Sequence, residues 1–169
     1  MERLTSKRDI TYTNKWGHEF RLLAFSSIDD QVKYLVQSKG LFFNTSAHGF
    51  AEMHFDEHLS QIYYNAKSPF LPDGVWSVRK FKDKSVLQVP GWDLVSGLLP
   101  VINEKDWRLH VIGASDEIVT RLQAKYPRLR ITADTGIIDV NKYPTEVGFS
   151  LEGCDCVLIC LGSPKQDIL

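Results

Sequence analysis

Five short turns carry the residues of this sequence that could do chemistry. Each combines small, polar or charged residues and follows a short apolar run: Asn44-Thr45-Ser46, Pro72-Asp73-Gly74, Pro90-Gly91-Trp92-Asp93, Gly113-Ala114-Ser115 and Gly162-Ser163-Pro164-Lys165-Gln166-Asp167. In an open parallel sheet, ligands bind where strands end and helices begin, because the free backbone amides there attract anions such as phosphate. We therefore expect the functional residues to lie in these turns.

Asp73 is the candidate general base. A carboxylate directly after a strand can reach a ligand crevice and take a proton from an attacking hydroxyl group. Pro-Asp-Gly is also a common turn sequence, and Asp is favoured at helix N-termini, so a purely structural role stays open.

Two later turns are candidates for binding phosphate or sugar. The small residues Gly113 and Ala114 would let backbone amides approach a diphosphate, and the Ser115 hydroxyl could add a hydrogen bond. In the last turn, Lys165 could pair with phosphate and Gln166 with sugar or diphosphate oxygens. A simple tight turn and a solvated lysine are the structural alternatives. No G-x-G-x-x-G or G-x-x-x-x-G-K-[ST] motif is present, so dinucleotide and P-loop binding lack their fingerprints.

The sequence does not predict a metal site. His54 and His58 are four residues apart, but the string between them is not H-E-x-x-H and no third ligand is evident. We expect His48 to be a helix residue with a side-chain partner and His110 to be a strand residue.

The turns must be positioned by strands and helices, and the hydrophobic pattern predicts both. Short apolar runs alternate with longer amphipathic stretches, which is typical of parallel strands joined by crossover helices. The predicted strands are Phe20–Phe25, Leu41–Phe43, Phe70–Leu71, Val86–Val89, Leu109–Gly113, Leu129–Ala133 and Cys156–Gly162. The run Val157–Leu161 is apolar throughout, which predicts cover on both faces of the sheet. The pattern predicts an α/β fold with a Rossmann-like, mostly parallel sheet and helices on both faces.

The clearest helix is predicted to follow Ser115, which would be its N-cap, and to end at Tyr126-Pro127. Asp116 and Glu117 fall in its first turn, where the helix dipole favours anions. The positions expected to be buried are Ile118, Val119, Leu122 and Tyr126. We expect residues 1–17 to be an irregular lead-in and residues 18–169 to form a single domain.

Composition narrows the class of protein. The 169 residues are 43% hydrophobic and 24% charged, which suits a compact domain. The net charge of -1 gives no basic field for nucleic acid. The polar N-terminus has no signal-peptide pattern, no apolar run could span a bilayer, and the three cysteines form no disulfide framework or zinc motif. These features predict a cytoplasmic protein.

Taken in order and spacing, the turns resemble those of the WecG/TagA/CpsF family, glycosyltransferase family 26. The resemblance runs from about Phe20 to Asp167. The matching segments are the PDG turn Pro72-Asp73-Gly74, the G-x-D-L segment Gly91-Trp92-Asp93-Leu94, Ile112-Gly113, Tyr126-Pro127 with Leu129, Gly136, and Gly162-Ser163-Pro164-Lys165-Gln166-Asp167, which is similar to G-x-P-K-Q-E.

The resemblance implies an inverting, metal-independent hexosyltransferase without a cofactor. It would move an N-acetylmannosamine-type sugar from a UDP donor to polyprenyl-diphosphate-linked N-acetylglucosamine, at the inner face of the cell membrane, in teichoic acid or exopolysaccharide synthesis. The absence of any D-x-D pair agrees with metal independence. By this resemblance Asp73 would be the general base, with Asn44 and Gln166 as further catalytic residues. The implied substrate-binding residues are Thr45, Ser46, Gly74, Gly91, Asp93, Gly113, Ala114, Ser115, Gly136, Gly162, Ser163, Pro164 and Lys165.

The sequence departs from the family pattern in four places. Asn44 stands where the family has threonine, Trp76 replaces a small residue, and Asp167 replaces glutamate. After Leu169 the family continues with a strand and a basic segment, so we expect the chain to lack that cover and to leave apolar surface that a homo-oligomer could bury. Two alternatives stay open: a catalytically impaired UDP-sugar binding protein of the same fold, and an unrelated Rossmann-like enzyme using a methyl or hydride donor.

Overall fold

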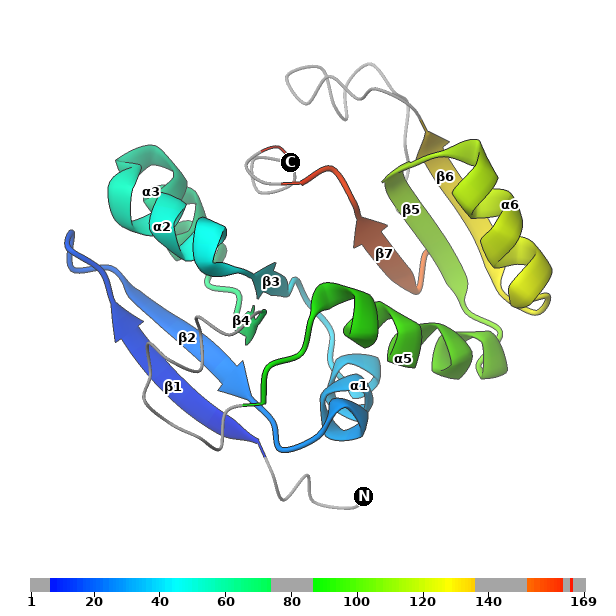
Figure 1. Cartoon of the computed structure of the whole chain (residues 1–169), viewed down its shortest axis with the longest axis horizontal. Coiled ribbons are helices and arrows are strands. Elements are labelled where there is room, and N and C mark those ends of the chain that lie inside the picture. The colour runs from blue at the N-terminus through cyan, green and yellow to red at the C-terminus, as the bar shows by residue number, and fades with distance from the viewer. Residues whose placement is uncertain (1–6, 74–86, 136–151, 163–164, 166–169) are drawn as a thin grey trace. The chain divides into compact units, whose positions relative to one another are not determined.

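The computed structural model describes residues 7–73, 87–135, 152–162 and 165 (Figure 1). The chain divides into two compact units, Met1–Leu98 and Leu99–Leu169, and each unit has its own sheet. Helix α5 (Gly91–Glu104) begins in the first unit and ends in the second. Four of the five strand pairs in the described ranges are parallel, so the α/β class with mostly parallel strands is confirmed. Among the described residues, no helix is both long and apolar enough to cross a membrane.

The sheet of the first unit has the strand order β1-β2-β4-β3. Its strands are β1 (Arg8–Thr13), β2 (Glu19–Ala24), β3 (Phe43–Thr45) and β4 (Phe70–Pro72). The first two form an antiparallel hairpin, and β4 pairs in parallel with β2 and β3 (Figure 1). The parallel pairing places the ends of β3 and β4 at the same edge of the sheet.

Three predictions in this unit need correction. Residues 8–13, expected in an irregular lead-in, form β1, because Ile10 and Tyr12 alternate with polar residues and pack against the core. Strand β3 begins at Phe43, two residues later than the predicted start. Residues 87–89 form no strand, although Leu87 and Val89 donate backbone hydrogen bonds to Phe25 and Pro72. Val86 lies outside the described residues.

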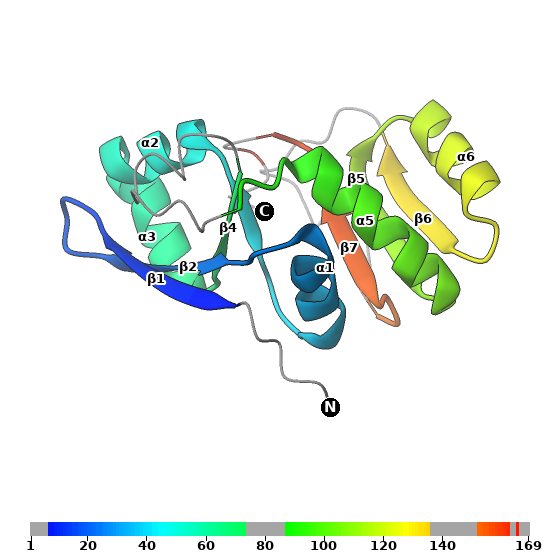
Figure 2. The same cartoon turned by 60° about the horizontal axis from the view of Figure 1, so that its bottom comes forward.

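Three further helices lie in the part of the first unit that the structure describes: α1 (Ile28–Gln37), α2 (Ala47–Phe55) and α3 (Glu57–Ala66). Helices α2 and α3 lie side by side (Figure 2). Asp56 separates them, and its carboxylate accepts a hydrogen bond of 3.0 Å from the Leu59 N–H as the N-cap of α3. His54 and His58 therefore belong to different helices and do not share one helical face.

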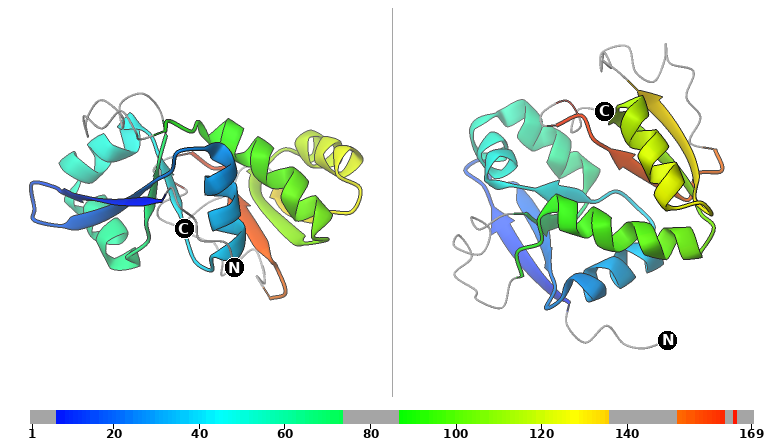
Figure 3. Two further views of the ribbon diagram at one scale, coloured as in Figure 1. Left: turned by 90° about the horizontal axis from the view of Figure 1, so that it is seen from below. Right: turned by 45° about the vertical axis from the view of Figure 1, so that its right-hand side comes forward.

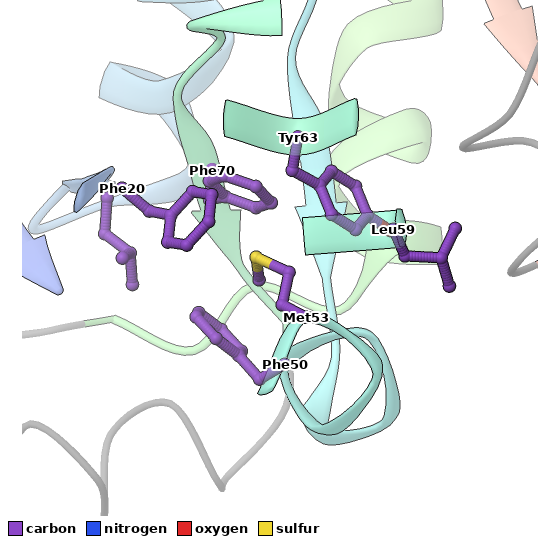
Figure 4. Packing of buried hydrophobic residues seen from close by; sticks show 7 residues of the cluster. Phe20, Phe50, Met53, Leu59, Tyr63 and Phe70 are labelled. Carbon is purple, nitrogen blue, oxygen red and sulfur yellow. The ribbon is translucent and has the colours of Figure 1, made fainter. Parts of the chain in front are cut away.

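Aromatic side chains dominate the core of the first unit (Figure 4). The buried cluster contains Phe20, Leu22, Phe50, Met53, Leu59, Tyr63 and Phe70. Phe70, fully buried on β4, lies with its ring centroid 5.7 Å from that of Phe20 and 5.4 Å from that of Tyr63. Edge-to-face contacts of this kind add to the free energy of burial. The cluster fixes β4 between the hairpin and the helices, and so fixes the start of the turn that follows β4.

The second unit has a three-stranded parallel sheet in the order β6-β5-β7. Its strands are β5 (Arg108–Ala114), β6 (Arg130–Thr135) and β7 (Cys156–Ile159). Helix α6 (Asp116–Lys125) lies along β5 and β6 (Figure 3). The predicted N-cap is confirmed, since the Ser115 hydroxyl accepts a hydrogen bond of 3.3 Å from Ile118 N–H, and Tyr126 ends the helix as expected.

Burial in the second unit is lower than predicted. Ile118 is 51% exposed, and Val119 and Leu122 are half-buried, so only Tyr126 of the expected buried set lies in the core. The apolar run on β7 is half-buried and the strand ends at Ile159. In the described sheet β7 is an edge strand that pairs with β5.

Candidate functional site

The end of β4 brings the candidate base beside the end of β3. Asn44 pairs with Leu71 and Thr45 with Pro72 in the parallel register. Directly after this pair, Asp73 N–H donates a hydrogen bond of 3.1 Å to the Thr45 carbonyl oxygen. This bond holds Asp73 at the carboxyl edge of the sheet, where the pattern of turns predicted it.

Asp73 has polar partners on β3 and at the start of α5. Asn44 Nδ2 donates to Asp73 Oδ2 over 3.3 Å, and the Gly91 backbone N–H also donates to the Asp73 carboxylate. The segment leading into α5 is held nearby by a bond of 3.4 Å from Val89 N–H to the Pro72 carbonyl. Asn44 and Gly91 are 47 residues apart in the sequence, yet both donate to the Asp73 carboxylate. The three residues therefore form one cluster within the first unit.

Gly91 is glycine because the Asn44 amide occupies the space of a side chain. A Cβ at this position would lie 2.6 Å from Asn44 Nδ2 and 3.7 Å from Asp73 Oδ2. The first distance is far shorter than a van der Waals contact, so any larger residue would displace the amide. The sequence identified Gly91 through its motif but gave no indication of this contact.

Two influences act in opposite directions on the pKa of Asp73. Burial raises the pKa because it disfavours the charged carboxylate, and the hydrogen bond from the Gly91 N–H lowers it. Burial has the larger effect, so the pKa lies above its ordinary value. A carboxylate with a raised pKa is a stronger base, which suits proton removal from a hydroxyl group.

The remaining candidates of the first unit surround this cluster in different ways. Thr45 is 4% exposed, and its methyl carbon would lie 3.0 Å from a Cβ added at Gly49. The Thr45 side chain therefore packs closely against Gly49. Ser46 begins α2 without a side-chain capping bond and is exposed, so its hydroxyl could contact a ligand. Asp93 is exposed in the first turn of α5.

The candidates of the second unit lie at the ends of β5 and β7. Gly113 has a φ of +86° and Gly162 a φ of +74°, both in the left-handed region that favours glycine. A Cβ on Gly113 would lie 3.2 Å from the Cys160 carbonyl oxygen, so this glycine also permits close packing of the two strand ends. Ala114 is buried, Ser115 is the cap of α6, and Lys165 is exposed. These contacts give the Gly113 turn a structural role, and ligand binding there stays a prediction.

Several predicted site residues lie outside the described part of the chain. They are Gly74, Gly136, Ser163, Pro164 and Gln166, together with the departures Trp76 and Asp167.

A buried polar group in the second unit was not singled out from the sequence as a site. His110 on β5 is 2% exposed, with its Nδ1 2.8 Å from Thr132 Oγ1 and its Nε2 3.3 Å from Asp134 Oδ2. A histidine inside an otherwise apolar strand is the signal that could have shown it. His48, as expected, is a helix residue paired with Glu52, and His54 Nδ1 lies 3.2 Å from the Tyr12 hydroxyl. Within the described ranges, no three His, Cys, Asp or Glu side chains gather to hold a metal ion.

Comparison with known protein families identifies the family of the chain. Residues 14–169 match the Glycosyl transferase WecG/TagA/CpsF family, and the matched range includes the Asp73 cluster and both glycine turns of the second unit. No curated protein matches the chain significantly. Because the family match covers far more than half of the chain, this protein belongs to the WecG/TagA/CpsF family of glycosyl transferases.

Proposed function

We propose that this protein is an inverting, metal-independent transferase of cell-surface polysaccharide synthesis. The donor would be UDP carrying an N-acetylmannosamine-type sugar, and the acceptor a polyprenyl-diphosphate-linked N-acetylglucosamine at the inner face of the membrane. Family membership supports sugar transfer. The observation that carries the proposal is the position of Asp73 at the carboxyl edge of the sheet, with burial raising its pKa and Asn44 and Gly91 hydrogen-bonded to it.

In the proposed reaction Asp73 takes the proton of the acceptor hydroxyl. The hydroxyl oxygen forms a bond to the anomeric carbon while the bond from that carbon to the UDP oxygen breaks, and the electron pair leaves with UDP. A single in-line displacement inverts the anomeric centre, as in inverting sugar hydrolysis. Asp73 later returns its proton to water.

The leaving diphosphate requires stabilisation of its developing charge. In this proposal Lys165 and Gln166 supply a cation and an amide, and the turns at Gly113 and Gly162 supply backbone amides. Ser46 and Asp93 are both exposed, and each lies two residues from a member of the Asp73 cluster in the sequence. In this proposal they would contact sugar hydroxyls.

A transfer assay with product analysis tests this function. The full chain is incubated with UDP-N-acetylmannosamine and a short-chain polyprenyl-diphosphate N-acetylglucosamine, with and without a chelator, and the product anomer is determined by NMR. We expect a product of inverted configuration at an unchanged rate in the chelator. Retained configuration, or loss of transfer on chelation with recovery on adding a divalent cation, would contradict the mechanism. Tight binding of the UDP-sugar without transfer would support the alternative of a UDP-sugar binding protein.

A further inference from the structure

Of the two polar atoms in the Asn44 side-chain amide, one makes a hydrogen bond to a described residue and the other does not. Nδ2 donates to Asp73 Oδ2 over 3.3 Å. Oδ1 is buried from solvent and accepts no hydrogen bond from any residue that the structure describes. A buried acceptor without a partner is unfavourable, and such groups in native proteins often mark a functional requirement.

The chemistry of Asp73 gives the second end of the amide a use. An ionised carboxylate only accepts hydrogen bonds, whereas a protonated carboxyl group also donates one. A general base passes through both states in each catalytic cycle. An amide beside it can serve both states by rotation, since Nδ2 donates to the ionised form and Oδ1 accepts from the protonated form.

We propose that Asn44 is the positioning residue of Asp73 in both protonation states. Its Nδ2 orients the ionised carboxylate toward the acceptor hydroxyl, and after proton transfer its Oδ1 accepts a hydrogen bond from the Asp73 carboxyl group. This inference rests on the proposed function, in which Asp73 is the base. It assigns Asn44 to the base instead of to the sugar. A threonine hydroxyl group likewise both donates and accepts a hydrogen bond.

Gly91 is the second part of this arrangement. Its N–H donates to Asp73, and its missing side chain leaves the space that the Asn44 amide fills. Burial and the Gly91 N–H shift the pKa of Asp73 in opposite directions, and burial has the larger effect. The nearby carboxylate of Asp93, in the same turn of α5, is exposed.

An NMR titration tests the pairing without requiring activity. The carboxyl ¹³C resonance of Asp73 is followed against pH in the wild-type chain and in Asn44→Leu, which has a similar volume but no polar atoms. Asn44→Leu removes a hydrogen bond from each protonation state, but the bond to the ionised carboxylate is the stronger of the two, so the Asp73 pKa should rise, by up to about one unit. Asn65→Leu is the matched control, because Asn65 is an exposed asparagine on α3, and it should leave the titration unchanged. An unchanged Asp73 pKa in Asn44→Leu would overturn the pairing.

Kinetics separate positioning from sugar binding. Asn44→Leu should lower kcat by about tenfold or more while the KM for the UDP donor stays within about twofold, because the base is misoriented and the donor site is intact. Asn44→Thr should recover most of the lost kcat. A raised KM at unchanged kcat would overturn the assignment and place Asn44 against the sugar. A normal Asp73 pairing in a chain that transfers no sugar would count against the proposed function alone.

A double-mutant cycle tests the role of Gly91 even if Asn44→Leu folds poorly. Gly91→Ala should displace Asn44 and raise the Asp73 pKa as Asn44→Leu does. In an Asn44→Ala background the Nδ2 atom that would clash with a Cβ at position 91 is absent. Adding Gly91→Ala should then change the Asp73 pKa by at most about 0.3 units. Gly97→Ala, a second glycine of α5 that faces Val32 and Ile28, is the control for altering the helix. Equal effects of Gly91→Ala in both backgrounds would contradict the proposed contact.

Discussion

Asp73 combines a partly buried carboxylate with donors that favour its ionised form. Its pKa in the folded chain is raised by burial, against the opposing hydrogen bond from Gly91. A group with a raised folded-state pKa stabilises the fold fully below its unfolded-state pKa, and this contribution is lost as the pH rises through the folded-state pKa. The ionised carboxylate therefore costs stability at neutral pH.

Asp73→Asn should unfold at the same temperature as the wild type or slightly higher at neutral pH, because the uncharged amide avoids the desolvation of a carboxylate. As the pH is lowered through the pKa of Asp73, the wild type should gain stability relative to the variant. Thermal unfolding followed by circular dichroism at several pH values measures this difference. A variant clearly less stable than the wild type at neutral pH would show that the carboxylate serves the fold.

The free thiol of Cys156 lies half-buried on β7. Burial, with smaller contributions from Asp155 and Cys154, raises the pKa of the Cys156 thiol to about 11. Since the thiolate is the reactive form, alkylation by iodoacetamide at neutral pH should be about 100-fold slower than for an ordinary cysteine. Peptide mass spectrometry after timed labelling measures the rate, and labelling in guanidinium chloride is the control. Equal rates in the folded and unfolded chain would contradict the assignment.

At the scale of elements, Asn14 joins the β1-β2 hairpin to two helices. Its side chain is 6% exposed, and Nδ2 donates to the Met53 carbonyl oxygen and the Ser60 hydroxyl over 3.2 and 2.6 Å. Its Oδ1 accepts hydrogen bonds from the backbone N–H groups of Trp16 and His18. One buried amide thus shapes the turn and attaches it to α2 and α3.

Asn14→Asp is expected to destabilise the chain. The substitution replaces the donor facing the Met53 carbonyl by an oxygen and buries a charge, which should lower the free energy of unfolding by about 2–3 kcal/mol. Asn65→Asp, on the exposed face of α3, should change it by no more than about 0.5 kcal/mol. Urea unfolding measures both variants. Equal effects of the two substitutions would show that the Asn14 bonds contribute little.

Periodicity predicted most elements but not their burial. The strands from Phe20, Phe70, Leu109 and Leu129 and the helix capped by Ser115 are confirmed within a few residues. Strand β1 was missed because its apolar positions, Ile10 and Tyr12, are too few to stand out among polar residues. Ile118 was placed in the core wrongly, since an apolar stripe shows a helix face but not how much of it a sheet covers.

The motifs located the Asp73 turn, but the partners of Asp73 could not be read from them. Asn44 and Asp73 meet because β3 and β4 pair in one particular register, and a shift of one residue would turn Asn44 to the other face. The role of Gly91 depends on an atom of Asn44 far away in the sequence. Neither the Asn44–Asp73 contact nor the Asn44–Gly91 contact can be inferred from the spacing of these residues along the chain.

At the scale of the whole molecule, the family match runs through both compact units. Residues 14–169 include the Asp73 cluster of the first unit and the Gly113 and Gly162 turns of the second. The family match therefore covers most of each unit, and neither unit alone accounts for it.

The role of Asp73 as general base is tested by the transfer rate of Asp73→Asn under saturating UDP-sugar and lipid acceptor, with UDP affinity measured by calorimetry. Loss of a general base should lower kcat by at least about 100-fold, while the Kd for UDP stays within about threefold of the wild type. Asp29→Asn, which removes an exposed carboxylate on α1, is the control for the loss of one negative charge. An Asp73→Asn protein that transfers sugar within about threefold of the wild-type rate would show that Asp73 is not the general base.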